Sequence, residues 1–451
     1  MNRENVAVIT EKEQLSYGQL KEETDRIASV LEERTVAVLV MEHELANVLF
    51  YLACMKKGVV PILLDAGSEP ETVKEYVQRY RPHYILLSGG SREYEPVPSY
   101  ERMACGQGVA VWKSSRMTET VRNDKLALLL TTSGTSGVSR LVRISWDNLR
   151  CNTKSICEYL KIRPEERAIT VLPLSYTYGL SVLHTHLFAG ATVLLTKRSI
   201  LQKEFWGFFE RNEATSLSGV PFTYELLEKG GFLEKRIPSL NTMTQAGGKL
   251  PVPLQRKFGE YAVRHGIRLY LMYGQTEATA RMSYLPPEDI LRKPGSAGIA
   301  IPGGRLYLER AENGEADEIV YAGENVSLGY AAGREDLDKG DDNRGVLHTG
   351  DTGYLDEEGY LYITGRQTAF AKIHGRRINL QELSERVRER WDIPVSCKED
   401  HGKIRVEYEW KTEEKMSEIL EWLGPYTKLG RHCFVPCGRK ELRKSTSGKY
   451  L

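Results

Sequence analysis

The chain has 451 residues, of which 41% are hydrophobic and 27% are charged, a composition typical of globular proteins with a sizeable core. Its 62 basic and 61 acidic residues leave a formal net charge of +1, which argues against a nucleic-acid partner. No segment approaches the run of about 20 apolar residues that spans a bilayer, and the first residues lack the apolar core of a signal peptide, so we expect no membrane span.

The first half of the chain alternates segments with helical spacing and short apolar runs typical of strands. Residues 15–31 and 44–57 predict helices, and the second of these helices is expected to end at Gly58. Strands are predicted for residues 36–40, 59–64, 84–87, 126–130, 168–172 and 191–195. Strands separated by helices indicate parallel sheets with helices on their faces.

A loop rich in hydroxyl groups and glycine, residues 131–140, directly follows the apolar run at 126–130. It contains six Ser or Thr side chains, two glycines and Arg140. Glycines let backbone N–H groups turn toward one point, hydroxyl groups add donors, and arginine adds fixed positive charge, which together suit a phosphate group. The loop lacks the G-x-x-x-x-G-K-[ST] pattern of a Walker A sequence. Ordinary loops also collect Ser, Thr and Gly, so this segment alone leaves both interpretations open.

The second half of the chain has a different pattern from about residue 314 onward. Short β-rich runs at 318–321 and 360–363 alternate with turns such as that at 356–359. After Gly365, a charged segment predicts strands and two helices, around residues 380–391 and 413–423. The sequence therefore predicts an α/β protein. Residues 1–365 form a large body of parallel and mixed sheets flanked by helices, with a small β-rich subdomain, and residues 366–451 form a small α+β C-terminal cap.

Six short motifs follow one another along the chain. They are T-S-G-T-S-G-V-S-R at residues 132–140, L-P-L-S-Y-T-Y-G at 172–179, Y-G-Q-T-E at 273–277, T-G-D at 349–351, G-R at 365–366 with K-I-H-G-R-R-I at 372–378, and S-G-K at 447–449. In this order they resemble the motifs of the adenylate-forming superfamily: acyl-CoA synthetases, amino-acid-adenylating domains and luciferases. Each motif alone is usually a turn, a helix start or a solvated tail. Six in the expected order favour the functional interpretation.

The resemblance implies one reaction, in which a carboxylate attacks the α-phosphorus of ATP and gives an acyl-adenylate and pyrophosphate. The loop would hold the departing phosphates, where negative charge grows, and Arg140 would keep the cation that the family places there. Glu277 and Thr135 would hold Mg²⁺, a hard cation that prefers oxygen ligands. Thr276 would donate its hydroxyl group to the α-phosphate, and Lys449 would bring positive charge to the reacting groups.

The resemblance also implies how the nucleoside is held. Tyr273 would stack on adenine, and Asp351, assisted by Arg366, would accept hydrogen bonds from the ribose hydroxyl groups. The predicted nucleotide-binding residues are Thr132, Ser133, Gly134, Thr135, Ser136, Gly137, Gly247, Gly248, Tyr273, Gly274, Gln275, Thr276, Glu277, Asp351 and Arg366. The predicted catalytic residues are Lys449, Arg140 and Thr276.

The acyl pocket is expected around the second motif. Residues 219–224 and 244–249 also resemble segments that line this pocket in the superfamily. We expect Tyr176, Tyr178, Gly179 and Phe222 to contact the acyl group. Amino-acid-adenylating relatives carry an Asp in the segment aligned with residues 175–178, where it pairs with the substrate ammonium group. This chain has none there, which disfavours an amino acid, and Phe222, Tyr224 and Tyr178 suggest an apolar acyl or aromatic acid.

The C-terminal motifs match the family's second half-reaction with some departures. Lys372, Gly375 and Arg377 are expected to serve thioester formation. Thr368 stands at the hinge position, where the family usually has Asp or Lys; a hinge need only absorb a backbone change, so rotation of the cap remains expected. The loop has Ser139-Arg140 in place of the family's Pro-Lys, and Arg binds phosphate in a planar, bidentate manner unlike Lys.

The preferred hypothesis is therefore an ATP-dependent acid–thiol ligase that acts on a small-molecule carboxylic acid and transfers the acyl group to coenzyme A. An alternative acceptor is the phosphopantetheine thiol of an acyl carrier protein. A third possibility is a relative that binds nucleotide or acyl ligand without turnover, although the intact Thr276, Glu277, Asp351 and Lys449 argue against it. Seven scattered cysteines, an odd number, favour reduced thiols and a cytoplasmic location.

Overall fold

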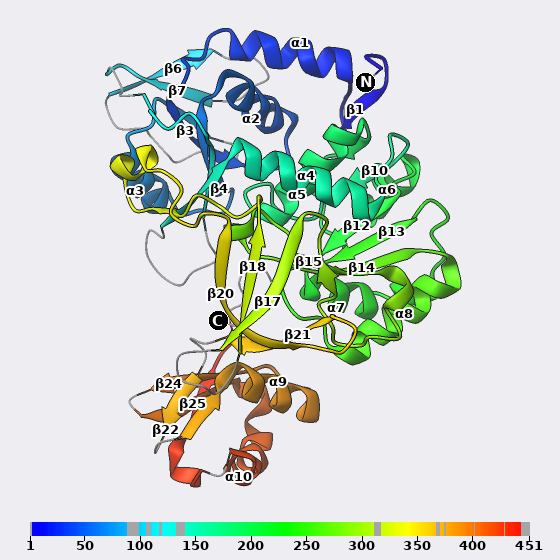
Figure 1. Cartoon of the computed structure of the whole chain (residues 1–451). Helices are drawn as coiled ribbons and strands as arrows, with labels where there is room; N and C mark the ends of the chain where they lie inside the picture. The colour runs from blue at the N-terminus through cyan, green and yellow to red at the C-terminus, as the bar shows by residue number, and fades with distance from the viewer. Residues whose placement is uncertain are drawn as a thin grey trace. The chain divides into compact units, whose positions relative to one another are not determined.

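A computed structural model of the chain describes residues 2–87, 99–104, 110–116, 120–131, 140–310, 317–366, 370–373, 376–400, 402–427 and 429–442. The chain forms two compact units (Figure 1). The first contains residues 1–305 and 322–347, and the second contains residues 306–321 and 348–451. The boundary expected near residue 365 lies at the end of a strand inside the second unit, so a separately moving cap of residues 366–451 stays a prediction.

The first unit contains a mainly parallel sheet that has nine strands within the described residues. The order across it is β16 (Ile299–Ala300), β15 (Ser283–Leu285), β14 (Arg268–Tyr273), β13 (Thr242–Gln245), β12 (Ser216–Gly219), β10 (Arg167–Ile169), β11 (Thr192–Leu194), β1 (Val6–Ile9) and β2 (Gln14–Ser16). The pairs from β14 through to β1 are parallel, and β15, β16 and β2 add antiparallel edges. The carboxyl ends of β12, β13 and β14 therefore lie side by side (Figure 1).

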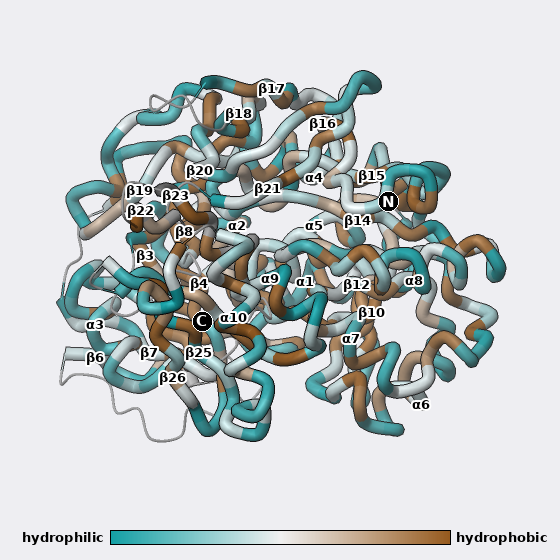
Figure 2. Tube along the Cα trace, turned by 90° about the horizontal axis from the view of Figure 1, so that it is seen from below, coloured by the Kyte–Doolittle hydropathy of each residue, from teal (hydrophilic) through white to brown (hydrophobic). Residues whose placement is uncertain are grey.

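A second, mixed sheet of the first unit has eight strands within the described residues. Its order is β19 (Tyr330–Ala331), β9 (Leu141–Ser145), β8 (Leu126–Thr131), β4 (Val60–Asp65), β3 (Val36–Met41), β5 (Tyr84–Leu87), β7 (Ala110–Ser114) and β6 (Tyr100–Ala104). Strands β8, β4, β3 and β5 are parallel, whereas β9 returns antiparallel to β8. Figure 2 shows the apolar strands β3, β4 and β8 in brown and the amphipathic helix α3 (Pro70–Tyr80) mainly in teal.

Helices connect these strands as the sequence predicts. Those of the first unit are α1 (Tyr17–Ala28), α2 (Leu45–Lys57), α3, α4 (Trp146–Leu160), α5 (Thr177–Ala189), α6 (Lys203–Arg211), α7 (Pro221–Lys229) and α8 (Val252–His265). Ser16 and Ser145 begin α1 and α4 with capping boxes, in which each serine side chain accepts a hydrogen bond from the N3 backbone. Helix α2 ends at Gly58, which confirms the predicted end. No helix in the described ranges is long and apolar enough to cross a membrane.

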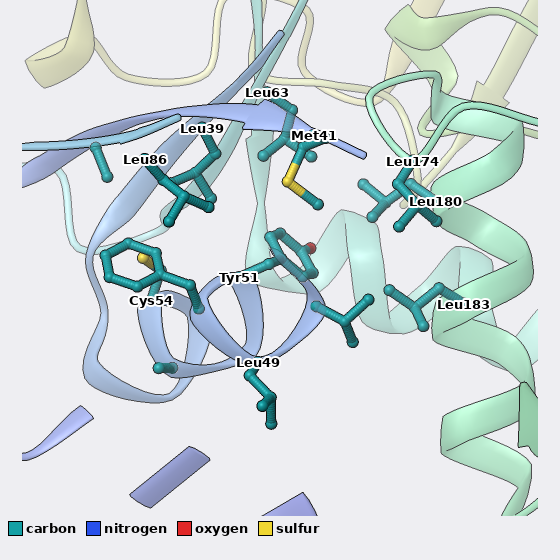
Figure 3. Packing of buried hydrophobic residues seen from close by; sticks show 14 of the residues in the cluster. Leu39, Met41, Leu49, Tyr51, Cys54, Leu63, Leu86, Leu174, Leu180 and Leu183 are labelled. Atoms are coloured by element: carbon teal, nitrogen blue, oxygen red, sulfur yellow. The ribbon is translucent and has the colours of Figure 1, made fainter. Parts of the chain in front are cut away.

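The core of the first unit explains why the sequences of its strands are continuous apolar runs. Ala37, Leu39 and Met41 of β3 face one hydrophobic cluster, whereas Val36, Val38 and Val40 face another, because successive residues of a strand point to opposite sides. Figure 3 shows side chains of β3 and β4 packed with Tyr51 of α2 and with Leu180 and Leu183 of α5. The cluster thus packs α5 against the mixed sheet. Leu174 also belongs to the cluster, so the segment just before α5 is held in place as well.

Among its described residues, the second unit contains three smaller sheets and its own core. Its elements are the sheet β17 (Gly304–Arg310), β18 (Asp317–Gly323), β20 (Val346–Leu355) and β21 (Leu361–Arg366); the hairpin β22 (Phe370–Ile373) and β23 (Arg376–Asn379); the sheet β24 (Val395–Asp400), β25 (Lys403–Glu409) and β26 (Phe434–Arg439); and helices α9 (Leu380–Trp391) and α10 (Met416–Thr427). Apolar side chains of α9, α10 and β25, including Leu383, Val387, Val406 and Ile419, form the core. The observed architecture confirms the predicted α/β class.

Several predicted elements have different bounds in the structure, and three of them differ most. The strand expected at 168–172 spans only Arg167–Ile169, and the helix expected at 15–31 is shorter at both ends. The last helix begins at Met416 rather than residue 413, because residues Trp410–Lys415 form a 3₁₀ helix. It also continues through Pro425 to Thr427, beyond the predicted end at residue 423, and the Thr427 hydroxyl group donates to the carbonyl oxygen of Leu423, 2.7 Å away.

Candidate active site

Several predicted site residues of the first unit lie at the carboxyl ends of β13 and β14, next to the end of β12. Gly219 ends β12, Gly247 and Gly248 follow β13, and Tyr273 ends β14 immediately before the Y-G-Q-T-E turn. In open α/β sheets, ligands bind at the carboxyl edge of the parallel strands. The arrangement therefore places a candidate site at this edge.

The turn after β14 has a strained backbone that the sequence motif fits. A Cβ atom at Gly274 would collide with the carbonyl group of Ala280, so only glycine fits there. Thr276–Ala278 form one turn of 3₁₀ helix, and the two residues that follow, Thr279 and Ala280, have φ angles of 53° and 106°. Non-glycine residues in such conformations cost free energy and occur preferentially at functional sites.

Asn325, which sequence reasoning missed, holds this turn from outside. The side-chain Nδ2 of Asn325 donates to the backbone carbonyl oxygens of Ala278 (2.8 Å) and Arg281 (2.9 Å). The backbone carbonyl oxygen of Asn325 accepts a hydrogen bond from the Thr279 hydroxyl group at 2.8 Å. These hydrogen bonds bracket the strained residues. Because they join positions far apart in the chain, no local pattern could have identified Asn325.

Glu277 is held by a second residue that the sequence did not reveal, Tyr330 of β19. The Tyr330 hydroxyl group donates to Glu277 Oε1 at 2.7 Å, and the Ser327 N–H donates to the Glu277 carbonyl oxygen at 2.8 Å. The guanidinium carbon of Arg140 lies 4.9 Å from the centre of the Tyr330 ring, a cation–π contact. Tyr330 thus brings together a predicted metal ligand and a predicted phosphate-binding cation.

The strands around the hydroxyl-rich loop also fix where the loop begins and ends. Thr131 of β8 pairs with Leu141 of β9, directly after Arg140. Both ends therefore lie at one edge of the second sheet. Six predicted residues of the loop, Thr132, Ser133, Gly134, Thr135, Ser136 and Gly137, lie outside the described residues.

The predicted acyl-binding side chains surround the start of α5. The hydroxyl group of Tyr176 lies over Gly247: with φ at 82°, a Cβ atom there would be 2.5 Å from the Tyr176 oxygen. The buried Tyr178 hydroxyl group is 2.7 Å from Thr244 Oγ1, which in turn donates to Ser218 at 2.9 Å. Phe222, at the start of α7, is 36% exposed. A Cβ atom added at Gly179 would lie 2.2 Å from the carbonyl oxygen of Pro173, so close packing against the backbone requires glycine at this position.

Arg281, a third residue that sequence reasoning missed, lies beside these tyrosines. Its guanidinium carbon is 3.9 Å from the centre of the Tyr178 ring, and its side chain is buried. Burial raises the pKa of Tyr176 to about 12 and also raises that of Tyr178, while the nearby Arg281 charge acts in the opposite direction. Both tyrosines therefore keep their protons at neutral pH and can donate hydrogen bonds. The sequence signal for Arg281 is a lone cation among the small and apolar residues 278–282.

The second unit holds a separate pair of predicted nucleotide-binding residues. Asp351 of β20 and Arg366 of β21 face each other in the strand register, and Arg366 Nε donates to Asp351 Oδ1 at 2.6 Å. Asp351 is only 5% exposed, and its N–H donates to the Thr349 hydroxyl group, which bonds the Ile319 carbonyl group. The carboxylate therefore has a fixed orientation.

The remaining C-terminal predictions lie partly outside the described residues. Lys372 of β22 and Arg377 of β23 are opposite each other in the hairpin register, but only their backbones are described. Thr368, Gly375 and Lys449 lie outside the described ranges. No cluster of three or more His, Cys, Asp or Glu side chains suited to a metal ion occurs among the described residues.

Comparison with known proteins gives consistent matches along the chain. The sequence model of the AMP-binding enzyme family matches residues 1–331. The 2-succinylbenzoate–CoA ligase of Bacillus cereus strain ATCC 10987 is 26% identical over 482 residues, covering 99% of this chain and 94% of that protein. The D-alanine–D-alanyl carrier protein ligase of Bacillus licheniformis is 24% identical over 408 residues, covering 85% of this chain and 80% of that protein.

Solved structures share the fold over the whole chain. The o-succinylbenzoate CoA synthetase MenE of Bacillus subtilis, in complex with its acyl-adenylate intermediate OSB-AMP, aligns with a TM-score of 0.80 and 22% identity, covering 100% of this chain and 95% of that chain. ATP-bound MatB of Rhodopseudomonas palustris aligns with a TM-score of 0.78 and 20% identity, covering 100% and 94% of the two chains. At these identities the similarity concerns the fold.

Proposed function

Because the chain belongs to the AMP-binding enzyme family, we propose that it is an ATP-dependent acid–thiol ligase that converts a carboxylic acid into a coenzyme A thioester. In the first half-reaction, a carboxylate oxygen attacks the α-phosphorus of ATP, and the bond from this phosphorus to the pyrophosphate oxygen breaks. In the second, the thiol attacks the acyl carbon, AMP leaves, and the thiol loses its proton. The observation that supports this proposal best is the gathering of Glu277, Tyr330 and Arg140 beside the turn after β14.

The groups at this turn suit the first half-reaction. We propose that Glu277 and Thr135 hold Mg²⁺, which binds proteins through one or two carboxylates together with substrate phosphates and neutralises their charge. The partly exposed Glu277 carboxylate fits this requirement, since Tyr330 orients it and it has no ion pair among the described residues. Thr276, on the same turn, is proposed to donate to the α-phosphate. Arg140 is proposed to stabilise the departing pyrophosphate, where charge develops.

Asp351 is proposed to bind the ribose of ATP. A carboxylate accepts hydrogen bonds from two neighbouring hydroxyl groups, provided that its orientation is fixed. Arg366 and Thr349 provide that orientation. The other nucleotide contacts proposed are Tyr273 on the adenine and Gly247, Gly248, Gly274, Gln275 and the loop residues 132–137 around the phosphates.

The C-terminal residues are proposed to complete both half-reactions. Lys449 supplies positive charge to the carboxylate and the α-phosphate during adenylation. Residues 366–451 act as a cap that rotates about Thr368, and Lys372, Gly375 and Arg377 then contribute to thioester formation. The resemblance of these motifs to the family pattern supports each assignment.

Coenzyme A is the preferred thiol because the 2-succinylbenzoate–CoA ligases match this chain over nearly its full length. The carrier-protein acceptor is the second candidate, favoured by the similarity to a D-alanyl carrier protein ligase. An amino-acid substrate is disfavoured, since residues 175–178 contain no acidic side chain. A cytoplasmic location remains a prediction based on the odd number of cysteines.

Pyrophosphate release by the full chain tests the proposal. The enzyme is incubated with ATP and Mg²⁺ over a panel of carboxylic acids, with and without coenzyme A. We expect release that depends on an acid, and an acyl-CoA product when coenzyme A is present. Release without a thioester would favour the carrier protein. A complete lack of release with every acid would leave only a binding role.

A further inference from the structure

Tyr330, which bonds Glu277 and stacks against Arg140, is a partly exposed side chain on a short strand. It is 37% exposed. Its strand, β19, has only two residues and lies at the edge of the mixed sheet, where it pairs with Leu141 and Val142 of β9. A two-residue edge strand forms few ladder hydrogen bonds. The position of the Tyr330 hydroxyl group therefore depends on what else holds the backbone at this point.

Arg143 of β9 holds that backbone. Its side chain is 0% exposed, and each of its five N–H donors has an acceptor. Nε donates to the Tyr330 carbonyl oxygen at 3.1 Å, and Nη2 donates to the Leu328 carbonyl oxygen at 2.7 Å. The Arg143 backbone accepts from the Leu328 N–H at 2.8 Å and donates to the Gly329 carbonyl oxygen at 2.9 Å. Four hydrogen bonds from one residue thus fix residues 328–330.

The same guanidinium also binds a second stretch of backbone, residues 339–342. Nη1 donates to the carbonyl oxygens of Lys339 (2.7 Å) and Gly340 (3.0 Å), and Nη2 donates to the Asp342 carboxylate at 2.6 Å. Asp342 supplies the negative charge that a buried guanidinium needs, and its side chain is 58% exposed. One cation therefore ties the surface stretch at 339–342 to β19.

Gly329 allows this ion pair to lie directly against the backbone before Tyr330. Its φ angle is 105°, a conformation that favours glycine. A Cβ atom there would be 2.8 Å from Asp342 Oδ2 and 3.2 Å from Arg143 Nη2. The backbone at position 329 is thus shaped around the pair.

Arg268 offers a comparison within the first unit. It also forms an ion pair, donating to the Glu166 carboxylate at 3.1 Å, and it donates to the Thr242 hydroxyl group at 2.7 Å. However, Arg268 begins β14, at the end of the strand opposite the Y-G-Q-T-E turn. Arg268 ties together strands of the parallel sheet, whereas the acceptors of Arg143 include the residue that bonds Glu277.

We infer that Arg143 is a positioning residue for the metal side of the site. By fixing the backbone of Tyr330, it sets where the tyrosine hydroxyl group meets Glu277 Oε1, 2.7 Å away, and where the ring meets Arg140. Arg143 itself takes no part in the chemistry, since its donors are used within the protein. The inference rests on the proposed function, because it concerns the carboxylate proposed to hold Mg²⁺.

Substitution by lysine tests the inference, because lysine keeps the charge and loses the planar fork of donors. The Mg²⁺ concentration for half-maximal pyrophosphate release and the KM for the acid are measured in Arg143→Lys and, as a matched control, in Arg268→Lys. We expect Arg143→Lys to raise this Mg²⁺ concentration about tenfold and to leave the KM for the acid unchanged. Arg268→Lys should lose stability without changing the Mg²⁺ concentration.

A Tyr330→Phe background shows whether the effect passes through the tyrosine hydroxyl group. There, Arg143→Lys should raise the Mg²⁺ requirement by less than about twofold, because the bond to Glu277 is already absent. An unchanged Mg²⁺ requirement in Arg143→Lys, or an equal rise in both backgrounds, would overturn the inference. If Arg143→Lys does not fold, Asp342→Asn takes its place, and the same outcomes apply.

A binding measurement separates failure of the inference from failure of the proposed function. Binding of Mn²⁺ in the presence of ATP, followed by electron paramagnetic resonance, requires no turnover. If the wild type releases no pyrophosphate with any acid, the proposed function fails, yet weaker Mn²⁺ binding in Arg143→Lys than in Arg268→Lys still supports the inference. Equal Mn²⁺ affinity in these two variants, or no Mn²⁺ binding by the wild type, would overturn it.

Discussion

Tyr330 and Glu277, 53 positions apart in the chain, are joined by a hydrogen bond of 2.7 Å, and the ring of the same tyrosine lies under the guanidinium of Arg140. Tyr330→Phe separates the two contacts, because the phenyl ring keeps the stacking and loses only the hydroxyl group. We expect the Mg²⁺ concentration needed for half-maximal pyrophosphate release to rise about tenfold, as for other residues that orient a metal ligand. Tyr354→Phe, at an exposed tyrosine of the second unit, is the control and should leave this concentration unchanged. An unchanged Mg²⁺ requirement in Tyr330→Phe would show that the Tyr330 hydroxyl group does not contribute to metal binding.

Gly247→Ala should impair acid binding by displacing Tyr176. The added Cβ atom would lie 2.5 Å from the Tyr176 hydroxyl oxygen. Gly303→Ala is a matched control, because Gly303 has a φ of 81°, close to the 82° of Gly247, and a Cβ atom added there would meet no other atom within 4 Å. Both variants should lose about 1 kcal/mol of stability from the left-handed backbone conformation. Only Gly247→Ala should raise the KM for the acid, by about tenfold. This increase in KM should be smaller in a Tyr176→Phe background, because the hydroxyl oxygen that the added Cβ atom meets is then absent.

Asp351→Asn should weaken ATP binding while the protein remains folded. The amide cannot form the ion pair with Arg366 and is a weaker acceptor for ribose hydroxyl groups, so we expect kcat/KM for ATP to fall about 30-fold. The wild type should discriminate against 2′-deoxy-ATP, and the variant should lose most of this discrimination. Glu357→Gln, at an exposed carboxylate of the same unit, serves as the control. Equal discrimination in Asp351→Asn and the wild type would exclude Asp351 from the ribose site.

Lys449→Ala should separate the two half-reactions. Without the lysine charge at the α-phosphate, adenylation should slow by at least about 100-fold. Thioester formation from a chemically prepared acyl-adenylate and coenzyme A should continue at a rate close to that of the wild type. Lys440→Ala removes an exposed lysine from the same C-terminal segment and should affect neither reaction. Normal adenylation by Lys449→Ala would show that this lysine has no catalytic role.

Two histidines of α5, the buried His186 and the partly buried His184, should make the protein sensitive to mild acid. Burial lowers the pKa of His184 and His186 to about 4, from 6.5. Between these pH values the unfolded chain takes up protons and the folded chain does not, so the free energy of unfolding falls as the pH decreases from 6.5 to 4, by up to about 3 kcal/mol per histidine. Urea unfolding at pH 7.5 and pH 5 measures this loss.

A His184→Gln variant tests the origin of that sensitivity. His184 Nε2 lies 2.7 Å from the Tyr51 hydroxyl group, to which glutamine can also hydrogen-bond. The variant should be less stable at pH 7.5 and should lose less stability between pH 7.5 and pH 5. His348→Gln, at an exposed histidine, should retain the wild-type pH dependence. An identical pH dependence in His184→Gln and the wild type would contradict the assignment.

Local patterns predicted the elements whose boundaries depend on nearby residues. Helix α9 spans the predicted residues, because its apolar spacing and its ends are set within the segment itself. Gly58 ends α2 for the same reason. The helix expected at 413–423 is shifted toward the C-terminus, since the preceding residues form a 3₁₀ helix and the Thr427 hydroxyl group bonds the last turn, which the apolar spacing does not encode.

The candidate site could be predicted only where its residues belong to contiguous motifs. Thr276, Glu277 and Asp351 are predicted as site residues because their neighbours in the chain form motifs, and their roles stay predictions. Asn325, Tyr330 and Arg281 were missed, because each acts on residues of another segment and stands in no motif of its own. Their roles depend on how strands distant in the sequence come together, which spacing along the chain does not reveal.

The turn held by Asn325 has Thr276 near one end and Arg281 at the other. The strained residues between them and their hydrogen bonds to Asn325 give the backbone little freedom to lengthen or shorten. This stretch of backbone should therefore accept changes of side chain at some positions but not insertions or deletions, because a change of length would break the hydrogen bonds to Asn325.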